Sequence, residues 1–424
     1  MEKTGRKTTG DQGASQVLLP LVGMLATVKG ALYELVMSSG MSVLMALLEQ
    51  EREELCGARY RHDSKRRASR AGYAPGELVL GGRRVTVKRP RMRSSDNKEV
   101  ALPSWEKLSS EDPLKKRAVE QMVLGVATRK YVRSLEPTPT DMKSRGTSKS
   151  AVSRRFVAET TAQLAAWTGR SLSELSLAVL MLDGIICGEH TVLVALGIDE
   201  EGSKHILGFW EGATENATAC TALLSSLVER GLNTTRSILV VIDGSKALAK
   251  AVRDTFGPRA MIQRCQVHKK RNVLEHLPEK ARASTGALIA TAYQCRDSKR
   301  AMDLLNKIAR QLERRHPGAA ASLREGLAET LTVISFHLPE SLAKVVSTTN
   351  ALENVNSTAR RVQRNVKRWQ GGSMVLRWMG VGLQEAERGF RRINGYPGMP
   401  KLVATLREND ARLDGSLVPE RKVA

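Results

Sequence analysis

The chain has 424 residues, of which 41% are apolar and 4% aromatic, with a formal net charge of +23 at pH 7. This length allows two to four compact regions with buried cores, and the surplus of Lys and Arg favours a polyanionic partner, because basic side chains displace counterions condensed on nucleic-acid phosphates. The sparse aromatics argue against a stacking platform for single strands, and five cysteines without a Cys-x-x-Cys pair indicate a reducing cytoplasm rather than a disulfide framework.

Segment 16–48 is apolar enough to raise a membrane surface as the rival partner. Lys29, Glu34 and several Gly and Ser residues interrupt it, so it lacks the continuous apolar span that a transmembrane helix needs. We interpret it as one or two buried or self-associating helices. The polar start of the chain does not resemble a signal peptide, and we expect no membrane partner.

A strongly basic stretch follows at 57–93, where twelve Arg and Lys residues face only Asp63 and Glu77. Charge so one-sided predicts phosphate contacts rather than an ordinary solvated face. Within it, ELVL and RRVTVKRPR alternate around Gly81-Gly82, which predicts a β-hairpin. The phosphate-binding candidates in this stretch are Arg66, Arg67, Arg89 and Arg91.

Segments 112–135 and 147–167 have helical spacing, and Ser and Thr residues near the start of the second are suited to cap it. The second helix carries Lys149, Arg154 and Arg155, which suggests a helix-turn-helix-like DNA reader. Its ten-residue connector is longer than that motif usually has, so an ordinary helical pair remains the alternative.

From residue 175 the pattern predicts an α+β region with the order β-β-β-α-β-α. Three consecutive strands can form an antiparallel meander, and the fourth, reached through a helical crossover, can lie parallel in the same mixed sheet. The expected segments are, in order, 175–183, 191–199, 203–212, 213–232, 237–244 and 246–257.

Two of these apolar strands end in the same dipeptide, at Asp183-Gly184 and Asp243-Gly244. If the first and fourth strands are neighbours, the two carboxylates meet and repel each other, and a divalent cation such as Mg²⁺ would relieve the repulsion. The alternative is that each Asp caps a turn before glycine.

A third carboxylate is expected from a later helix. Glu353 stands out because Asn356 and Arg360 share its helix face and further basic residues follow; a surface ion pair is the alternative role. The other glutamates considered are Glu325, Glu329, Glu340, Glu385 and Glu387, and the basic residues that extend the positive surface are Arg361, Arg364, Lys367 and Arg368.

We predict that the remaining segments are helical. Segment 261–345 is charge-rich and shows no strand pattern, 346–369 reads as one helix, and 371–393 reads as another. Cys265-x-x-His268 could be half of a zinc site, but no second pair follows at a suitable spacing. A local clamp near the active site, or plain packing, is the preferred interpretation.

Several of these pieces are long and rare: ALGIDEEGSKHILGFWEGATENA, ILVVIDGSKALAKAV, QRCQVHKKRNVLEHLP and STTNALENVNSTARRVQRNVKRW. Through them the chain resembles Mutator-type transposases of bacterial insertion sequences over about 110–400. The resemblance implies a ribonuclease-H-like core with an Asp-Asp-Glu triad, which falls on Asp183, Asp243 and Glu353. The family's Cys-x-x-His signature falls on Cys265 and His268.

The expected regions are an amino-terminal helical and basic hairpin region, a helix-turn-helix-like region, a core interrupted by an all-helical insertion, and carboxyl-terminal helices. Their expected boundaries are 1–105, 106–172, 173–260, 261–345 and 346–424.

The resemblance also implies what such a protein does. It would bind double-stranded DNA at the terminal inverted repeats and at the target, with Mg²⁺ or Mn²⁺, as two ions, held by the triad. It would act as a homodimer or higher oligomer in the bacterial cytoplasm, at the nucleoid. A catalytically inactive DNA-binding relic or repressor, and a nuclease that cuts without joining, remain the alternatives.

Overall fold

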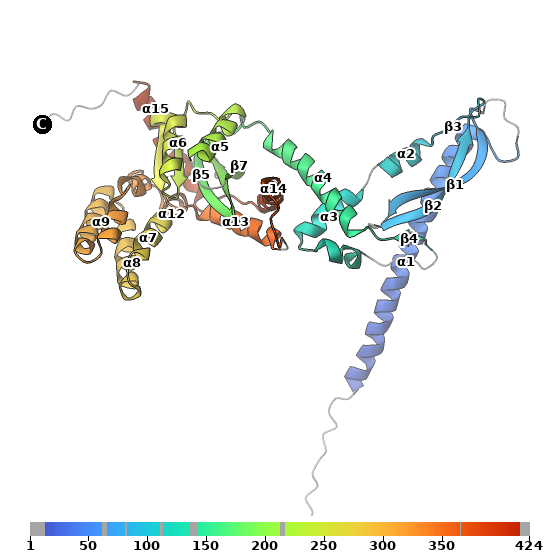
Figure 1. Cartoon of the computed structure of the whole chain (residues 1–424), viewed down its shortest axis with the longest axis horizontal. Coiled ribbons are helices and arrows are strands. Elements are labelled where there is room, and N and C mark those ends of the chain that lie inside the picture. The colour runs from blue at the N-terminus through green and yellow to red at the C-terminus, as the bar shows by residue number, and fades with distance from the viewer. Residues whose placement is uncertain are drawn as a thin grey trace, which may run out of the picture. The chain divides into compact units, whose positions relative to one another are not determined.

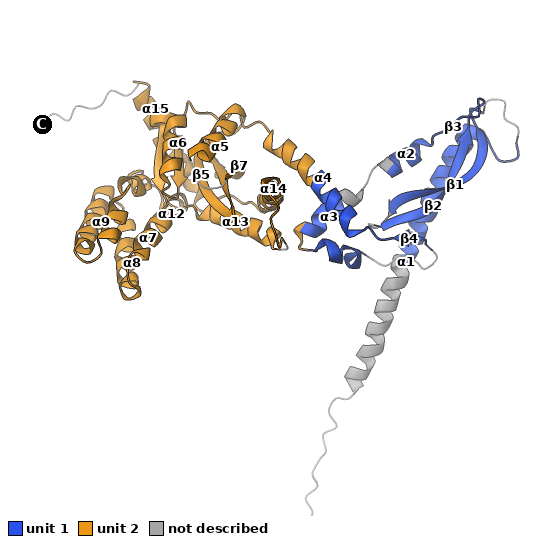
Figure 2. Cartoon of the chain, in the orientation of Figure 1, with its two compact units in different colours: residues 1–122, 126–159 blue, residues 123–125, 160–424 orange. Residues whose placement is uncertain are grey.

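The computed structural model separates into two compact units, one formed by residues 1–122 and 126–159 and the other by residues 123–125 and 160–424 (Figures 1 and 2). The boundary falls within α4 (Lys149–Thr168). The residues described are 13–61, 66–80, 83–110, 113–135, 142–212, 217–364 and 366–415.

In the first unit, the apolar segment predicted at 16–48 is part of a single long helix, α1 (Gly13–Cys56). No helix in the described ranges has an apolar stretch long enough to cross a membrane. The end of α1 packs through Leu48 against a small sheet, in a core that contains Leu78, Val85 and Trp105.

The predicted hairpin is confirmed as β1 (Ser69–Leu80) paired antiparallel with β2 (Arg83–Arg93), with Leu80 opposite Arg83; residues 81–82 lie outside the described residues. The short strands β3 (Glu99–Val100) and β4 (Ser144–Arg145) both pair with β2. The remaining elements of this unit are α2 (Pro103–Ser110), α3 (Pro113–Val123) and the 3₁₀ helix η1 (Thr128–Ser134).

The helix predicted at 147–167 is confirmed as α4. The segment predicted as one helix at 112–135 instead divides into α3 and η1, and Gly125 between them has a φ of +94°, in the left-handed region that favours glycine and ends a helix. Because η1 and β4 lie between α3 and α4, the helix-turn-helix interpretation stays a prediction.

The second unit is built on a mixed five-stranded sheet in the order β7-β6-β5-β8-β9. The first three strands in the chain are antiparallel, and β8 is parallel to both β5 and β9, as the predicted order of elements requires. The strands are β5 (Leu177–Cys187), β6 (His190–Asp199), β7 (Lys204–Gly212), β8 (Ile238–Ile242) and β9 (Ala260–Arg264).

Two strand predictions were wrong. The first strand does not end at Asp183 but continues to Cys187, since Gly188, with φ +66°, supplies the turn into β6. The segment predicted to lack strands begins with β9. That strand was missed because its last two residues, Gln263 and Arg264, are polar although buried, and so break the apolar run that signals an inner strand.

Helices cover both faces of the sheet, and side chains alternate between two cores along each strand. Residues Leu180 and Leu182 of β5 pack with α5 (Ala217–Glu229) and α6 (Lys246–Phe256), whereas Val179 and Met181 pack on the opposite face. That face is covered by α12 (Glu340–Val346), α13 (Asn350–Gln363), α14 (Gly372–Arg388) and α15 (Met399–Leu413).

The segment after β9 is helical, as predicted, and shares a core of its own that includes Ile289, Leu305 and Leu323. Its elements are α7 (Gln266–Glu275), α8 (Glu279–Tyr293), α9 (Ser298–Glu313), α10 (Pro317–Arg324), η3 (Ala328–Thr330) and α11 (Thr332–Ser335). Two further 3₁₀ turns are η2 (Gly257–Arg259) and η4 (Tyr396–Gly398).

The predicted helix 346–369 is shorter than expected, since α13 ends at Gln363. Trp369 packs against the β5–β6 turn, where a Cβ on Gly188 would lie 2.5 Å from its ring. The indole thus packs against the sheet from beyond the end of the helix. The helix predicted at 371–393 is present as α14, which ends at Arg388.

The close packing of α13 against α14 gives a first prediction. A Cβ on Gly382 would lie 2.7 Å from the Cα of Ala359, whereas a Cβ on Gly380 would meet the end of the flexible Leu164 side chain at 2.8 Å. Both changes to alanine gain the same helix propensity. We expect Gly382→Ala to lower the free energy of unfolding by about 1–3 kcal/mol, because backbone must move, and Gly380→Ala to cost clearly less. Urea unfolding of both variants measures this, and equal stability of the two would contradict it.

Candidate active site

Asp183 and Asp243 lie side by side at the junction of two parallel strands. In the β5–β8 register the last paired residues are Leu182 and Ile242, and each aspartate is the next residue in its strand's direction. Side chains alternate between the two faces of the sheet along each strand, so residues two positions apart share a face. Met181 and Val241 face the core formed with α13, and the carboxylates of Asp183 and Asp243, two residues further on, therefore point toward α13 as well.

Glu353 approaches the aspartates from the first turn of α13. The three carboxylates line one open cleft of about 690 Å³, which we call the acidic cleft. Asn356 and Arg360, which the sequence placed on the same helix face as Glu353, line it as well. The other lining residues are Gly184, Ile186, Thr191, His268, Arg271, Asn272, Asn354 and Ser357.

The electrostatics of the cleft disfavour negative charge on Asp183. The residue is only 8% exposed, and burial raises the pKa of its carboxyl from the ordinary 3.8 to about 6. Asp243, and to a smaller extent Glu353, raise this pKa further by repulsion, while the imidazole of His268 opposes the rise. Burial and the neighbouring carboxylates therefore outweigh the effect of the imidazole on Asp183.

The Cys265–His268 pair connects three segments around the cleft. The backbone N–H of Cys265 donates to the carbonyl of Ile242 at 2.7 Å, and its Sγ accepts the backbone N–H of Thr349 at 3.4 Å. His268 Nδ1 lies 3.4 Å from Thr349 Oγ1. The motif thus joins the end of β8, the start of α7 and the residue that precedes α13.

His268 also holds the glutamate. Its Nε2 lies 3.3 Å from Glu353 Oε1 in an ion pair, and the Glu353 side chain is 43% exposed. The hydrogen bond with Cys265 raises the pKa of His268 to about 9 against the opposing effect of burial, so the imidazole is cationic at neutral pH. Burial raises the pKa of the Cys265 thiol, but hydrogen bonds from His268 and Thr349 outweigh it and lower the pKa overall.

The donor atoms of the acidic cleft fit a hard divalent cation. Three carboxylates face it, and Asn356, 2% exposed, has an Oδ1 with no hydrogen-bond partner. Oxygen donors of this kind suit Mg²⁺ or Mn²⁺. In the described parts of the chain no three His, Cys, Asp or Glu side chains are gathered as a finished metal-binding group, and Glu353 is held by His268 in this arrangement.

The other glutamates considered in the sequence lie in ion pairs outside the acidic cleft. Glu340 pairs with Lys344 and Glu385 with Arg388. Glu387 binds Arg170 and accepts the backbone N–H of Ile206. Glu325 and Glu329 pair with Arg264. Of the six candidates, Glu353 alone lines the cleft.

The basic candidates differ in whether their side chains are paired with other residues or exposed to solvent. Arg89 and Arg91 are both engaged by Glu99 at 2.8 Å, and Arg155 donates to Thr147 Oγ1 at 3.2 Å. Others, including the positive stripe along and after α13, are exposed to solvent. The exposed members are Arg66, Arg67, Lys149, Arg154, Arg360, Arg361, Arg364, Lys367 and Arg368.

Sequence reasoning did not single out Arg271 and Asn272, which line the cleft from α7. It also missed the buried cations Arg264 and Lys269. The available signal was the run RCQVHKKRN, in which four basic residues and a histidine follow a short apolar stretch.

Comparison with known proteins gives consistent similarities over most of the chain. The profile described as "Transposase, Mutator family" matches residues 25–392. The transposase for insertion sequence element IS256 in transposon Tn4001 of Staphylococcus aureus is 26% identical over 359 residues, which cover 81% of this chain and 88% of the relative. The transposase for ISRM5 of Rhizobium meliloti (strain 1021) is 29% identical over 374 residues, covering 85% and 90%. The transposase for IS406 of Burkholderia multivorans is 28% identical over 347 residues, covering 80% and 86%.

The raised pKa of Asp183 predicts how pH affects the metal-free chain. Between about pH 4 and about pH 6 the unfolded Asp183 is ionised while the folded one still holds its proton, so stability falls as pH rises and levels off above about 6. A rise from 3.8 to about 6 corresponds to about 3 kcal/mol. We therefore expect Asp183→Asn to raise the free energy of unfolding in chelator by up to about 3 kcal/mol at pH 7.5.

Urea unfolding of the wild type and Asp183→Asn at pH 4.5 and pH 7.5 measures this difference. The advantage of the asparagine variant should be larger at the higher pH. The same advantage at both values would contradict a raised pKa for Asp183.

Proposed function

Because the chain belongs to the Mutator family of transposases, we propose that it binds the terminal inverted repeats of its insertion sequence and catalyses metal-dependent DNA cleavage and strand transfer. The observation that carries this proposal is the acidic cleft, in which Asp183, Asp243 and Glu353 face one space from three separate segments. The proposed catalytic triad consists of these three residues.

We further propose that the second unit is a ribonuclease-H-like core with a helical insertion. Three antiparallel strands, a helical crossover and a parallel fourth strand support this assignment. The helical segment between β9 and α12, with its own core, supports the insertion. The proposed core then spans 173–260 and 346–424. In addition, β9, which continues to Arg264, belongs to the sheet of this core.

The three carboxylates would hold the divalent cations, Mg²⁺ or Mn²⁺ and two in number. When bound, such ions activate an attacking water or 3′-hydroxyl and stabilise the leaving oxygen of a phosphodiester. The chain's own residues prepare this site: His268 fixes the rotamer of Glu353, and burial holds Asp183 away from bulk water. Arg360, at the wall of the cleft, is suited to contact a phosphate of the scissile strand.

We propose direct attack without a covalent protein intermediate. The hydroxyl groups that line the acidic cleft belong to Thr191 and Ser357, and the three carboxylates that would hold the metal ions face the same space. The nucleophile is therefore assigned to water in the cleavage step and to a DNA 3′-hydroxyl in the joining step.

DNA recognition is proposed to come from the amino-terminal residues 1–172. The exposed Arg66 and Arg67 would contact the phosphate backbone, and Lys149 and Arg154 of α4 would approach base edges. The stripe from Arg360 to Arg368 would bind DNA near the cleft. Two ends must be held together for strand transfer, so we propose a homodimer or higher oligomer acting on the bacterial nucleoid in the cytoplasm.

Removing any one of the three carboxylate charges should abolish the chemistry. We expect Asp183→Asn, Asp243→Asn and Glu353→Gln each to lower nicking of end-bearing DNA by more than about 100-fold, because even residues that only support metal ligands cost 10–100-fold. DNA-end binding, measured by gel shift, should stay within about 3-fold of wild type. Glu340→Gln, which removes an exposed glutamate paired with Lys344, is the matched control.

Mapping of nicked and joined strands with Mg²⁺ supplies the readout. Nicking by Glu353→Gln at the wild-type rate would contradict the triad. Nicked DNA without any joined product would instead identify a hydrolytic nuclease.

The difference between free and paired arginines gives a prediction for DNA binding. Arg67 is exposed, whereas Arg91 is engaged by Glu99. We expect Arg67→Gln to weaken binding of the full chain and to reduce the slope of log K against log salt by about one. Arg91→Gln should change the slope less, because Arg91 is held in an ion pair with Glu99, which it shares with Arg89. Titration of end DNA at several salt concentrations tests this, and equal slopes for the two variants would contradict it.

A further inference from the structure

A second group of charges is buried beside Asp243 but does not line the acidic cleft. Arg264, the last residue of β9, is 7% exposed, and Lys269 of α7 is 4% exposed. Burying two cations is costly unless both are paired and hydrogen-bonded. The partners of these cations therefore report which parts of the chain must be docked in the folded state.

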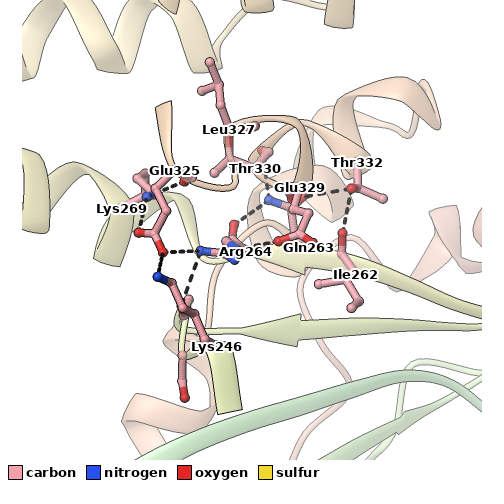
Figure 3. A network of polar contacts seen from close by, with 12 residues as sticks. Lys246, Ile262, Gln263, Arg264, Lys269, Glu325, Leu327, Glu329, Thr330 and Thr332 are labelled. Carbon is pink, nitrogen blue, oxygen red and sulfur yellow. Dashed lines mark hydrogen bonds and ion pairs between the residues drawn. The ribbon is translucent and has the colours of Figure 1, made fainter. Parts of the chain in front are cut away.

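The partners come from residues 322–333, which run from the last turn of α10 through η3 to the start of α11 (Figure 3). Arg264 Nε lies 2.5 Å from Glu329 Oε2. Lys269 Nζ donates to the carbonyls of Ser322 and Glu325, at 2.7 Å each. Arg264 is thus paired with a carboxylate and Lys269 is hydrogen-bonded to two carbonyls, and all three partners lie in the segment 322–329.

The strand itself is joined to the same loop. Gln263 Nε2 donates to the carbonyl of Thr330 at 2.9 Å, and its Oε1 accepts the backbone N–H of Val333 at 2.9 Å. Thr332 Oγ1 donates to the carbonyl of Ile262 at 2.6 Å. The backbone of β9 and the loop therefore form one connected polar layer.

Arg264 extends this layer to the loop that carries Asp243. Its Nη1 donates to the carbonyl of Gly244 at 3.3 Å. Gly244 has a φ of +114°, and Asp243 Oδ1 accepts the backbone N–H of Ser245 at 2.8 Å. The turn that orients Asp243 is thus held by one hydrogen bond within the turn itself and by one from the guanidinium of Arg264.

Close packing leaves this guanidinium little freedom. Gly326, with φ +60°, covers it so closely that an added Cβ would lie 2.4 Å from Arg264 Cζ. Glu325 lies 3.7 Å from the same guanidinium and from Lys269. The loop 325–330 therefore determines where the side chain of Arg264 can be.

We propose that Arg264 is a positioning residue that ties the turn 243–245 to the helical segment through the loop 325–330, so that the orientation of Asp243 depends on this loop being docked. The inference rests on the proposed function of the acidic cleft. The inference gives the helical segment between β9 and α12 a role in the acidic cleft: through the loop 325–330, this segment maintains the orientation of Asp243.

Two glycine substitutions separate this role from general strain. Gly326→Ala and Gly257→Ala both place alanine at a positive φ, +60° and +57°, but nothing lies within 4 Å of a Cβ on Gly257. Gly257 also has a ψ of −137°, outside the left-handed helical region, so alanine is strained there as well. Only the first change displaces Arg264. We expect Gly326→Ala to lower the nicking rate at saturating end DNA by 10–100-fold, with unchanged DNA affinity, and Gly257→Ala to keep the rate within about 2-fold.

A readout independent of nicking is the affinity for Mn²⁺ alone, measured by calorimetry on the full chain without DNA. Gly326→Ala should bind Mn²⁺ about 10-fold or more weakly than Gly257→Ala, because Asp243 is no longer held. Arg264→Lys keeps a cation beside Glu329 but cannot also reach Gly244, and it should show the same weakening. It also provides the test if Gly326→Ala fails to fold.

Wild-type Mn²⁺ affinity and nicking rate in Gly326→Ala or in Arg264→Lys would overturn the inference. An equal loss in Gly326→Ala and Gly257→Ala would do the same, since strain at glycine would then explain it. If the wild type binds Mn²⁺ but does not nick DNA, the proposed function fails, while the difference in Mn²⁺ affinity between the two glycine variants still supports or overturns the positioning role.

Discussion

Repulsion between the carboxylates of Asp183, within β5, and Asp243, directly after β8, is the constraint around which the second unit is organised. Asp183 and Asp243 follow directly on a paired position of two parallel strands, and Asp183 is buried enough for its pKa to rise to about 6. Such an arrangement costs free energy in the absence of a counter-charge. The fold tolerates this cost because the two apolar cores on either side of the sheet hold the strands in register.

The fold supplies a partial counter-charge of its own. His268, cationic because Cys265 raises its pKa, faces Asp183 and pairs with Glu353. Arg271 and Arg360 also line the cleft, so its three carboxylates share the space with three basic side chains. His268 also restrains Glu353, whose side chain is 43% exposed.

Near the ends of β8 and β9, two buried basic side chains are paired with acidic residues and carbonyls. Arg264 and Lys269 are deeply buried, yet their charges are met by Glu325, Glu329 and backbone carbonyls. Buried pairs of this kind contribute little net stability but penalise any structure in which one partner is displaced. Asp243 thus has the open acidic cleft on one side and a closely packed layer of paired charges on the other.

Local patterns in the sequence were enough to predict the mixed sheet, the hairpin of the first unit, the adjacency of Asp183 and Asp243 and the helix face that carries Glu353, Asn356 and Arg360, because apolar periodicity and turn residues act over a few positions. They placed the end of the first strand wrongly at Asp183. They did not reveal β9, whose buried Gln263 and Arg264 look like surface residues until their partners sixty residues away are known. Nor could they place the end of α13 at Gln363, bring Trp369 against Gly188, or pair Glu353 with His268. Those features were decided only by the tertiary structure, since the neutralisation of a charge and the fit of a side chain depend on neighbours that are distant in the chain.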